Sequence, residues 1–114
     1  MQAFFVEMPP FERHRQEYLD DEGFLGLQNE LMKNPEAGAV IAGAGGLRKL
    51  RYADTKRGKG KRGGLRIIYY GWVSEDQFWL FTVYDKDEAT DLTAGQRRAL
   101  ANMVNCELEA RSTK

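Results

Sequence analysis

Histidine and cysteine are almost absent from this chain of 114 residues, since each occurs once, as His14 and Cys106. A lone cysteine cannot form an internal disulfide, and one cysteine with one histidine cannot supply a zinc-ligand set at the usual spacing. We therefore expect no disulfide, no metal site and no other cofactor. The local patterns favour ordinary roles, with Cys106 filling the core side of an amphipathic helix and His14 on the solvated side of a charged helix.

Long apolar runs are also absent. No run approaches the roughly 18 residues that a bilayer-spanning helix needs, and the first ten residues, MQAFFVEMPP, contain neither a basic flank nor a long apolar stretch. These absences predict a soluble, cytoplasmic protein. With 42% hydrophobic and 30% charged residues, the chain is long enough and apolar enough for a single globular domain that spans residues 1–114.

Net charge is the third absence, because 17 Lys and Arg balance 17 Asp and Glu. The charges are nevertheless separated along the chain. Nine basic residues and one acid, Asp54, stand between Arg48 and Arg66, which leaves eight basic and sixteen acidic residues elsewhere. The window therefore carries +8 and the remainder −8. Such a separation favours a polyanionic partner for one face of the protein.

The hydrophobic pattern predicts an α+β layer arrangement: an N-terminal strand, two helices, a small antiparallel sheet and a C-terminal helix. The expected strands are residues 3–7, 47–53, 65–73 and 78–84, and the expected helices are 11–19, 21–32 and a segment that begins after Thr93. A proline pair closes the first strand. Thr93 and Gln96 form a capping box for the last helix. The polar link 74–77 is short enough for a hairpin, so the last two strands should pair antiparallel.

The glycine-rich segment 38–46 is expected to be a flexible connection. Its GAGG run at 43–46 precedes a strand, whereas a phosphate-binding loop precedes a helix, and the chain has no Gly-Lys-Ser/Thr element. The glycines therefore indicate a turn into the next strand. Residues 54–64, DTKRGKGKRGG, cannot bury a core and are expected to form a mobile basic loop, although a solvated surface loop or a nuclear-import signal has the same composition.

Strand alternation predicts where the cations lie. It places Lys49 and Arg51 on one face of their strand and Leu50 on the other. Arg66 opens the next strand, where a polar side chain contributes little to the core, and Lys86 follows the last, so all four cations should converge at one edge of the sheet. Because strand 65–73 is apolar on both faces, we expect helices to cover one face and the other to form a concave site. Exposed strands also carry cations merely to protect their edges, so the pattern alone leaves both interpretations open.

Several motifs resemble the HigB-type branch of the RelE family of bacterial toxins. They are GLRKLR at 46–51, GKGKRGG at 58–64, RIIYY at 66–70 and TVYDKDEATDLT at 82–93, and the segments FERHRQEYL and LQNELMKNPEAG extend the resemblance over nearly the whole chain. The resemblance implies a small α+β ribonuclease fold as a single toxin domain. It also implies ribosome-dependent cleavage of messenger RNA in the decoding site, and neutralisation by a cognate antitoxin, expected to be a helix-turn-helix protein.

The resemblance assigns roles to four cations. The family's paired basic positions fall on Lys49 and Arg51, with a one-residue uncertainty that brings in Arg48. The arginine that opens the next strand is Arg66. The basic residue after the last strand is Lys86, where much of the family has arginine, so a bidentate phosphate contact becomes a point charge.

A departure from the family concerns the general acid or base. Many relatives place a catalytic tyrosine about six residues after the last basic position, where this chain has Leu92. Tyr84 is the nearest alternative, and its place in the strand is compatible with the site. The basic loop is expected to hold RNA backbone without reading bases, and the RNA-binding set is Arg48, Lys56, Arg57, Lys59, Lys61 and Arg62.

Metal-free cleavage of RNA needs a base for the ribose 2′-hydroxyl, positive charge around the attacked phosphate and an acid for the leaving 5′-oxygen. Arg66 suits a bidentate phosphate clamp, and Lys49, crowded by other cations, is a candidate general base. A fast autonomous ribonuclease of the two-histidine type is not supported, because the chain has one histidine. The alternative is a non-cleaving RNA- or ribosome-binding module of the same fold, for which Leu92 and Lys86 argue. A purely protein-binding role for the helices is the third hypothesis.

Overall fold

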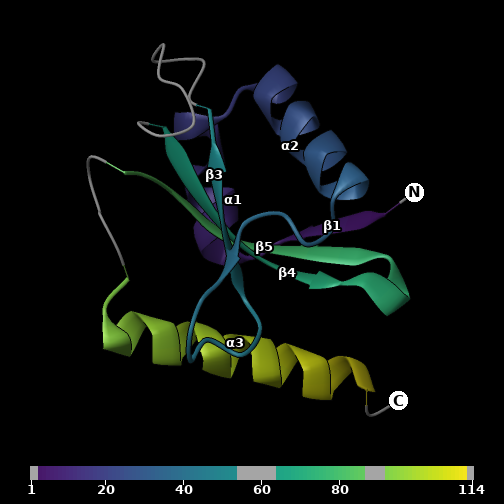
Figure 1. Ribbon diagram of the computed structural model, residues 1–114, viewed down its shortest axis with the longest axis vertical. Helices are drawn as coiled ribbons and strands as arrows, with labels where there is room; N and C mark the ends of the chain where they lie inside the picture. Colours follow the sequence, from purple (N-terminus) through teal and green to yellow (C-terminus); the bar gives the residue numbers. More distant parts are fainter. Residues whose placement is uncertain (1–2, 54–63, 87–91, 113–114) are drawn as a thin grey trace.

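The computed structural model describes residues 3–53, 64–86 and 92–112 (Figure 1). Its elements are, in chain order, β1 (Phe4–Glu7), α1 (Pro9–Tyr18), α2 (Asp21–Lys33), β2 (Ala39–Val40), β3 (Arg48–Tyr52), β4 (Leu65–Trp72), the short 3-10 helix η2 (Val73–Glu75), β5 (Gln77–Asp85) and α3 (Ala94–Ser112). The predicted α+β class is confirmed. The order of one strand, two helices, a strand region and a C-terminal helix is confirmed as well.

The strands form a five-stranded sheet in the order β1-β5-β4-β3-β2. The β4–β5 pair is an antiparallel hairpin as predicted, closed by η2 and by Asp76 in the left-handed conformation (φ 54°). β1 pairs with β5 in parallel, while β2 pairs antiparallel with β3 through Ala39 and Val40. Sequence analysis missed β2, because two residues among glycines are too few to show alternation. The region expected to be only a connection thus contributes an edge of the sheet.

Local capping chemistry explains where the helices begin. Pro9 and Pro10 occupy the first turn of α1, where backbone N–H groups have no helical partner, so the proline pair starts a helix as well as ending a strand. The Asp20 carboxylate accepts a hydrogen bond from the Gly23 N–H at 2.7 Å and caps α2. The expected capping box of α3 is confirmed, with Thr93 N donating to Gln96 Oε1 at 2.8 Å and Gln96 N donating to Thr93 Oγ1 at 3.1 Å.

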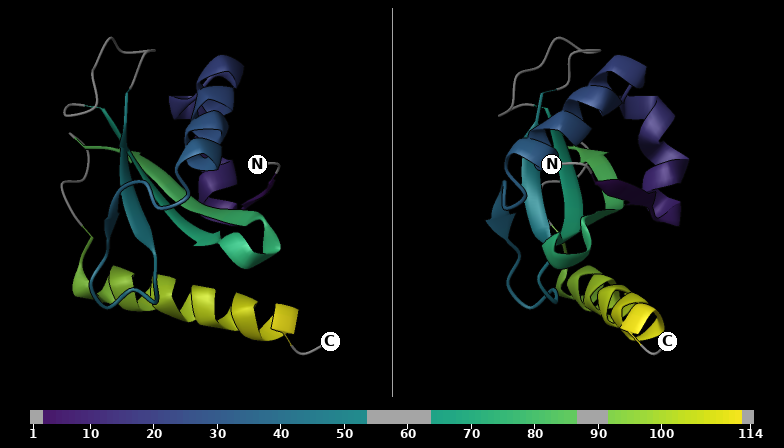
Figure 2. Two further views of the ribbon diagram at one scale, coloured as in Figure 1. Left: turned by 45° about the vertical axis from the view of Figure 1, so that its right-hand side comes forward. Right: turned by 90° about the vertical axis from the view of Figure 1, so that its right-hand side faces the viewer.

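Helices cover both faces of the sheet, so the expectation of one bare concave face is wrong. On one face α1 and α2 bury a cluster that includes Phe11, Leu31 and Ile67, and on the other α3 buries a cluster that includes Trp79 and Val104. Figure 2 shows α3 on the opposite side of the sheet from α1 and α2. The reason is the doubly apolar character of β4 and β5, which leaves two surfaces to be removed from water.

The loop between β2 and β3 packs against α3 (Figure 1). Ala44 and Leu47 are buried there. Gly45 has φ +68°, and a Cβ added to it would lie 3.5 Å from the Ala101 Cα. The glycines therefore serve a turn with a close backbone approach, as expected. Cys106 is exposed, so its expected core position is wrong: it lies about 200° around the helix from the buried Val104. No helix among the described residues is long and apolar enough to cross a membrane.

Candidate active site

Three strands bring two cations and a tyrosine into one row. Arg51 on β3 lies opposite Arg66 on β4, and Arg66 lies opposite Tyr84 on β5. Residues directly opposite one another on adjacent strands project from the same face. Ile68, two residues beyond Arg66, belongs to the cluster under α3, so the row lies on that face. We call these three residues the Arg51–Arg66–Tyr84 row.

Tyr84 reaches this face because β5 contains a β-bulge. Tyr69 pairs with Leu80 and Ile68 pairs with Thr82, so Phe81 is an extra residue in the strand. Before the bulge Leu80 lies in the cluster under α1 and α2, whereas after it Tyr84 belongs to the α3 side. An uninterrupted strand would have placed Leu80 and Tyr84 on the same face. The bulge therefore aligns the phenol with Arg66, a use of bulges that is common beside active sites.

The remaining two cations of the predicted site lie close to this row. Lys49 is in register with Ile68, which is in register with Thr82, one step further along the same face. Lys86 follows β5, and its backbone N–H donates to the Gly64 carbonyl at 3.2 Å, which brings it to the strand end where β4 begins. The structure therefore gathers Lys49, Arg51, Arg66 and Lys86 at one end of the sheet, as predicted.

The four cations differ in exposure. Arg51 and Lys86 are exposed and Lys49 is half-buried, but Arg66 is only 6% exposed and its Nη1 donates to the Leu65 carbonyl at 3.2 Å. The expectation that Arg66 contributes little to the interior is therefore wrong. Its central place in the row, between two strands that each carry a large side chain opposite it, explains the burial. The hydroxyl oxygen of Tyr84 is likewise shielded from solvent.

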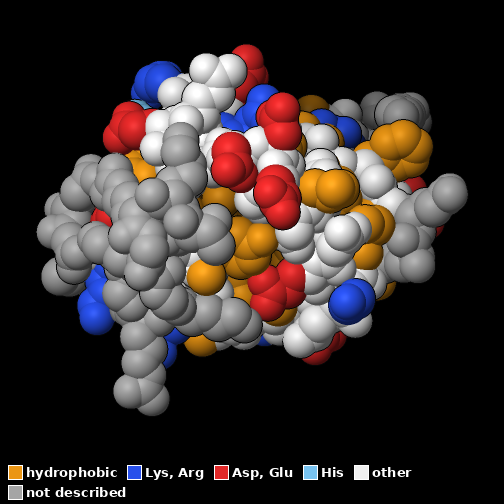
Figure 3. Space-filling view, turned by 90° about the horizontal axis from the view of Figure 1, so that it is seen from above, with side chains coloured by type: hydrophobic (Ala, Val, Ile, Leu, Met, Phe, Trp, Pro, Cys, Tyr) orange, Lys and Arg blue, Asp and Glu red, His pale blue; other side chains and the backbone are white. Residues whose placement is uncertain are grey.

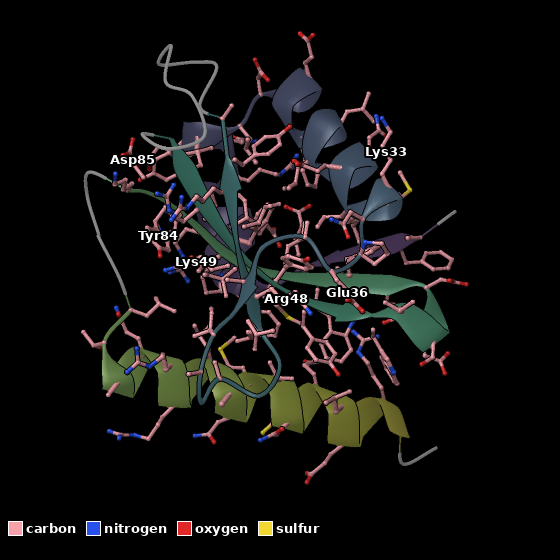
Figure 4. The ribbon with its side chains drawn as sticks, in the orientation of Figure 1. Lys33, Glu36, Arg48, Lys49, Tyr84 and Asp85 are labelled. Atoms are coloured by element: carbon pink, nitrogen blue, oxygen red, sulfur yellow. The ribbon has the colours of Figure 1, made fainter. Side chains whose placement is uncertain are left out.

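Arg48 lies apart from this group. Its guanidinium Nη1 donates to the carbonyls of Glu36 and Gly38 at 3.0 and 3.1 Å, and its Nη2 lies 3.9 Å from the Glu36 carboxylate. Figure 4 shows Arg48 beside Glu36, whereas Lys49 and Tyr84 lie together elsewhere on the sheet. Of the three basic residues considered for the paired positions, Arg48 is thus the one that lies away from the row. Arg48 instead ties β3 to the segment after α2.

Other predicted site residues have varied positions. The loop cations Lys56, Arg57, Lys59, Lys61 and Arg62 lie outside the described residues. Leu92, which replaces a tyrosine of the resembled family, lines a pocket together with Tyr84. Within the described ranges, no group of three or more His, Cys, Asp and Glu side chains is arranged to hold a metal ion.

Sequence reasoning missed three polar positions near the row. Thr82 and Gln96 line the pocket beside Tyr84, and Asp85 is completely buried at the end of β5, in register with Leu65. A carboxylate is rarely buried completely, so the signal available for Asp85 was a charged residue at the end of the aromatic run FWLFTVYD. Thr82 and Gln96 carried no comparable signal, because a threonine in a strand and a capping glutamine are ordinary.

Two tyrosines fix the sheet to α2 and to the segment that follows it. The Tyr69 hydroxyl donates to the Ala37 carbonyl at 2.6 Å, and its burial raises the pKa of Tyr69 to about 12. The Tyr52 hydroxyl donates to the Gly23 carbonyl at 2.9 Å, and desolvation raises the pKa of Tyr52, with a contribution from the Glu30 carboxylate. Both phenols are therefore neutral hydrogen-bond donors that hold β3 and β4 in place.

The fold is RelE-like: an α+β sheet with two helices on one face and a C-terminal helix on the other. A solved structure that shows this likeness is a mutant of the E. coli toxin RelE in the free state. The match covers 79% of this chain and 90% of that chain, with a TM-score of 0.53 and 14% sequence identity. No protein-family model matches the chain.

Proposed function

We propose that the protein is the toxin of a toxin-antitoxin pair, of the HigB-type branch, and that it cleaves messenger RNA on the ribosome in the bacterial cytoplasm. The observation that carries this proposal is the Arg51–Arg66–Tyr84 row, with Lys49 beside it, at one end of a RelE-like sheet. The motif resemblance supports the HigB-type assignment. Its partners are then messenger RNA on the ribosome and a cognate helix-turn-helix antitoxin.

The row is suited to an anion. Arg51 stands directly opposite Arg66, so two guanidinium groups belong to one cross-strand pair. A phosphate bound between them receives charge-assisted hydrogen bonds from these planar groups. Arg51 is exposed and makes the first contact, while the buried Arg66 acts at short range where the dielectric constant is low.

The cleavage step follows from these positions. The ribose 2′-oxygen attacks the phosphorus and the bond to the 5′-oxygen breaks, which leaves a 2′,3′-cyclic phosphate and a 5′-hydroxyl. Lys49 takes the proton of the 2′-hydroxyl, and Tyr84 gives a proton to the leaving oxygen. Arg51, Arg66 and Lys86 stabilise the negative charge that develops on the phosphoryl oxygens. The ribosome holds the RNA in the conformation for in-line attack, which a site without a histidine pair needs.

The test is to map 5′-hydroxyl ends of a message on programmed ribosomes, together with growth after induction. Arg51→Ala should lower the cleavage rate about 10²–10³-fold, because it removes one preorganised donor. Arg13→Ala, an exposed arginine on α1, is the matched control and should cleave normally. Lys86→Arg should retain or raise activity, since a guanidinium restores a planar fork. If a folded Arg51→Ala variant cleaves as fast as the parent, the row is not the active site.

A second candidate function is a non-cleaving RNA- or ribosome-binding module. The burial of Arg66 and of the Tyr84 hydroxyl oxygen favours it, because a closed row has less access to a phosphate. The same assay separates the two functions. Binding to ribosomes and growth inhibition without new 5′-hydroxyl ends would establish the module and reject the nuclease.

A further inference from the structure

A pocket adjoins the Arg51–Arg66–Tyr84 row, and its lining residues other than Tyr84 have no part in the cleavage step. It has a volume of about 320 Å³ and lies between β5, the first turns of α3 and the start of α1. Its walls are mainly apolar and come from Pro10, Leu92, Ala99 and Leu100. Two polar side chains, Thr82 and Gln96, also face it, and Tyr84 is shared with the row.

The size and position of this pocket fit one unpaired nucleobase. A base has two flat apolar faces and a polar edge, which match apolar walls with a few polar groups. Thr82 is two residues from Tyr84, which is about 7 Å along β5. A phosphate at the row therefore places a base one sugar away, at the mouth of the pocket. The cations of the row select for a ligand that carries phosphate beside that base.

The polar groups of the pocket are preorganised. In the capping box, Gln96 Oε1 accepts a hydrogen bond from the Thr93 N–H at 2.8 Å. This bond orients the amide and leaves Nε2 as its donor towards a ligand. The Thr82 hydroxyl both donates and accepts. A base with a hydrogen-bond acceptor on its edge would accept a hydrogen bond from Gln96 Nε2. The capping residue of α3 would then also bind the ligand.

We propose that this pocket, named here the base pocket, binds one unpaired RNA base next to the phosphate held by the row and sets the base preference of cleavage. The proposal rests on the proposed function, since it deepens the description of the same site. It makes Thr82 and Gln96 specificity-determining residues. It also explains why an apolar residue is suitable at position 92, because the Leu92 side chain forms part of a wall against which the base packs.

The test fills the pocket and leaves the residues of the row unchanged in sequence. Ala99→Phe places a ring in the base pocket, and Ala110→Phe adds the same ring at an exposed site near the end of the same helix. Circular dichroism and thermal melting verify that both variants fold. The first readout is the affinity of the isolated protein for a short single-stranded RNA that contains 2-aminopurine and is 2′-deoxy throughout the cleavable positions. The second is the distribution of bases beside the cut on programmed ribosomes.

Ala99→Phe should weaken the binding of this RNA about 10-fold or more, because the base loses its apolar contacts in the pocket, and Ala110→Phe should bind like the parent. Thr82→Val, which keeps the shape and removes the hydroxyl, should alter the base distribution beside the cut. If Ala99→Phe binds and selects bases as the parent does, the base pocket is rejected while the nuclease stands. If the parent cleaves nothing yet its binding depends on Ala99, the proposed function fails, base binding by the pocket stands and its role in cleavage preference is rejected. No binding by the parent protein rejects the pocket.

Discussion

At the residue scale, the buried hydroxyl of Tyr69 makes the stability of the fold depend on pH. Its hydroxyl donates to the Ala37 carbonyl, and burial raises its pKa to about 12 from the ordinary value of 10.0. Below about pH 10 both the folded and unfolded states keep this proton. Between pH 10 and 12 the unfolded state loses it first, so unfolding becomes more favourable as pH rises. We expect the stability supplied by Tyr69 to fall by up to about 1.4 kcal/mol per pH unit in this window.

The variant Tyr69→Phe isolates this contribution. At pH 8 the variant should be about 1–2 kcal/mol less stable than the parent, because the Ala37 carbonyl loses its donor. Urea denaturation at pH 8 and pH 11 measures the difference in unfolding free energy between the two proteins. That difference should shrink at pH 11, since phenylalanine has no proton to lose. A difference that stays constant would show that the phenol titrates equally in both states.

The residues of the site were predictable to different degrees. Alternation alone assigned Lys49 and Leu50 to opposite faces, and the register confirms it. The face of Tyr84 depends on the bulge at Phe81, which no residue type in the strand marks, because bulges arise from the pairing of two strands. The burial of Arg66 also could not be predicted from the sequence, because burial depends on which residues lie beside a side chain in space.

At the scale of elements, the β2–β3 hairpin positions Lys49. Gly38 has φ +87°, and a Cβ there would overlap the backbone carbonyl of Lys49. Gly38→Ala should therefore destabilise the protein by about 2–4 kcal/mol, from backbone strain and from displacement of β3. Cleavage should fall as well, because Lys49 belongs to the site. Urea denaturation and the ribosome assay measure the two effects.

Gly43→Ala is the matched control for this prediction. Gly43 has φ +72°, in the same conformational region, but a Cβ there would meet no atom within 4 Å. Its cost should be about 1 kcal/mol, from the left-handed conformation alone, with cleavage retained. Equal losses of stability in the two variants would mean that the cost of Gly38→Ala comes from backbone strain at φ and not from overlap with the Lys49 carbonyl.

Local elements were more predictable than their partners. Helix boundaries followed from capping chemistry, such as Thr93 and Gln96, because caps act within a few residues. The parallel pairing of β1 with β5 joins residues more than seventy positions apart, and periodicity within β1 contains no information on its neighbour. The expectation of one bare face was wrong for a related reason. The pattern showed that the strands are apolar on both faces, but it did not show which face α3 covers.

At the scale of the whole molecule, the charges are balanced in number and separated along the chain. Acidic side chains gather in the middle of the surface seen in Figure 3. Asp21 and Glu22 stand in the first turn of α2, where they complement the helix dipole. The cations of the site lie at the end of the sheet where β3 and β5 end. A polyanion approaching this molecule is therefore oriented by its field, with the face that bears the row towards it and the acidic first turn of α2 on the opposite face.

This charge separation predicts the salt dependence of RNA binding. Each phosphate contact on a single strand contributes about 0.7 to the slope of log affinity against log salt concentration. The double variant Lys49→Ala/Arg51→Ala should therefore flatten the slope by about 1.4 if both side chains contact phosphate. The measurement is the affinity for a labelled single-stranded RNA whose ribose 2′-oxygens are methylated, which prevents cleavage, across a series of salt concentrations.

The matched control for net charge is Arg13→Ala/Lys33→Ala, which also removes one arginine and one lysine, from exposed positions on α1 and α2. Figure 4 shows Lys33 well away from Lys49. Since a Debye length at physiological ionic strength is about 8 Å, distant charges are largely screened and the control should keep the parent slope. Equal flattening in both double variants would mean that RNA responds to the total charge of the protein, and that the row makes no direct phosphate contact.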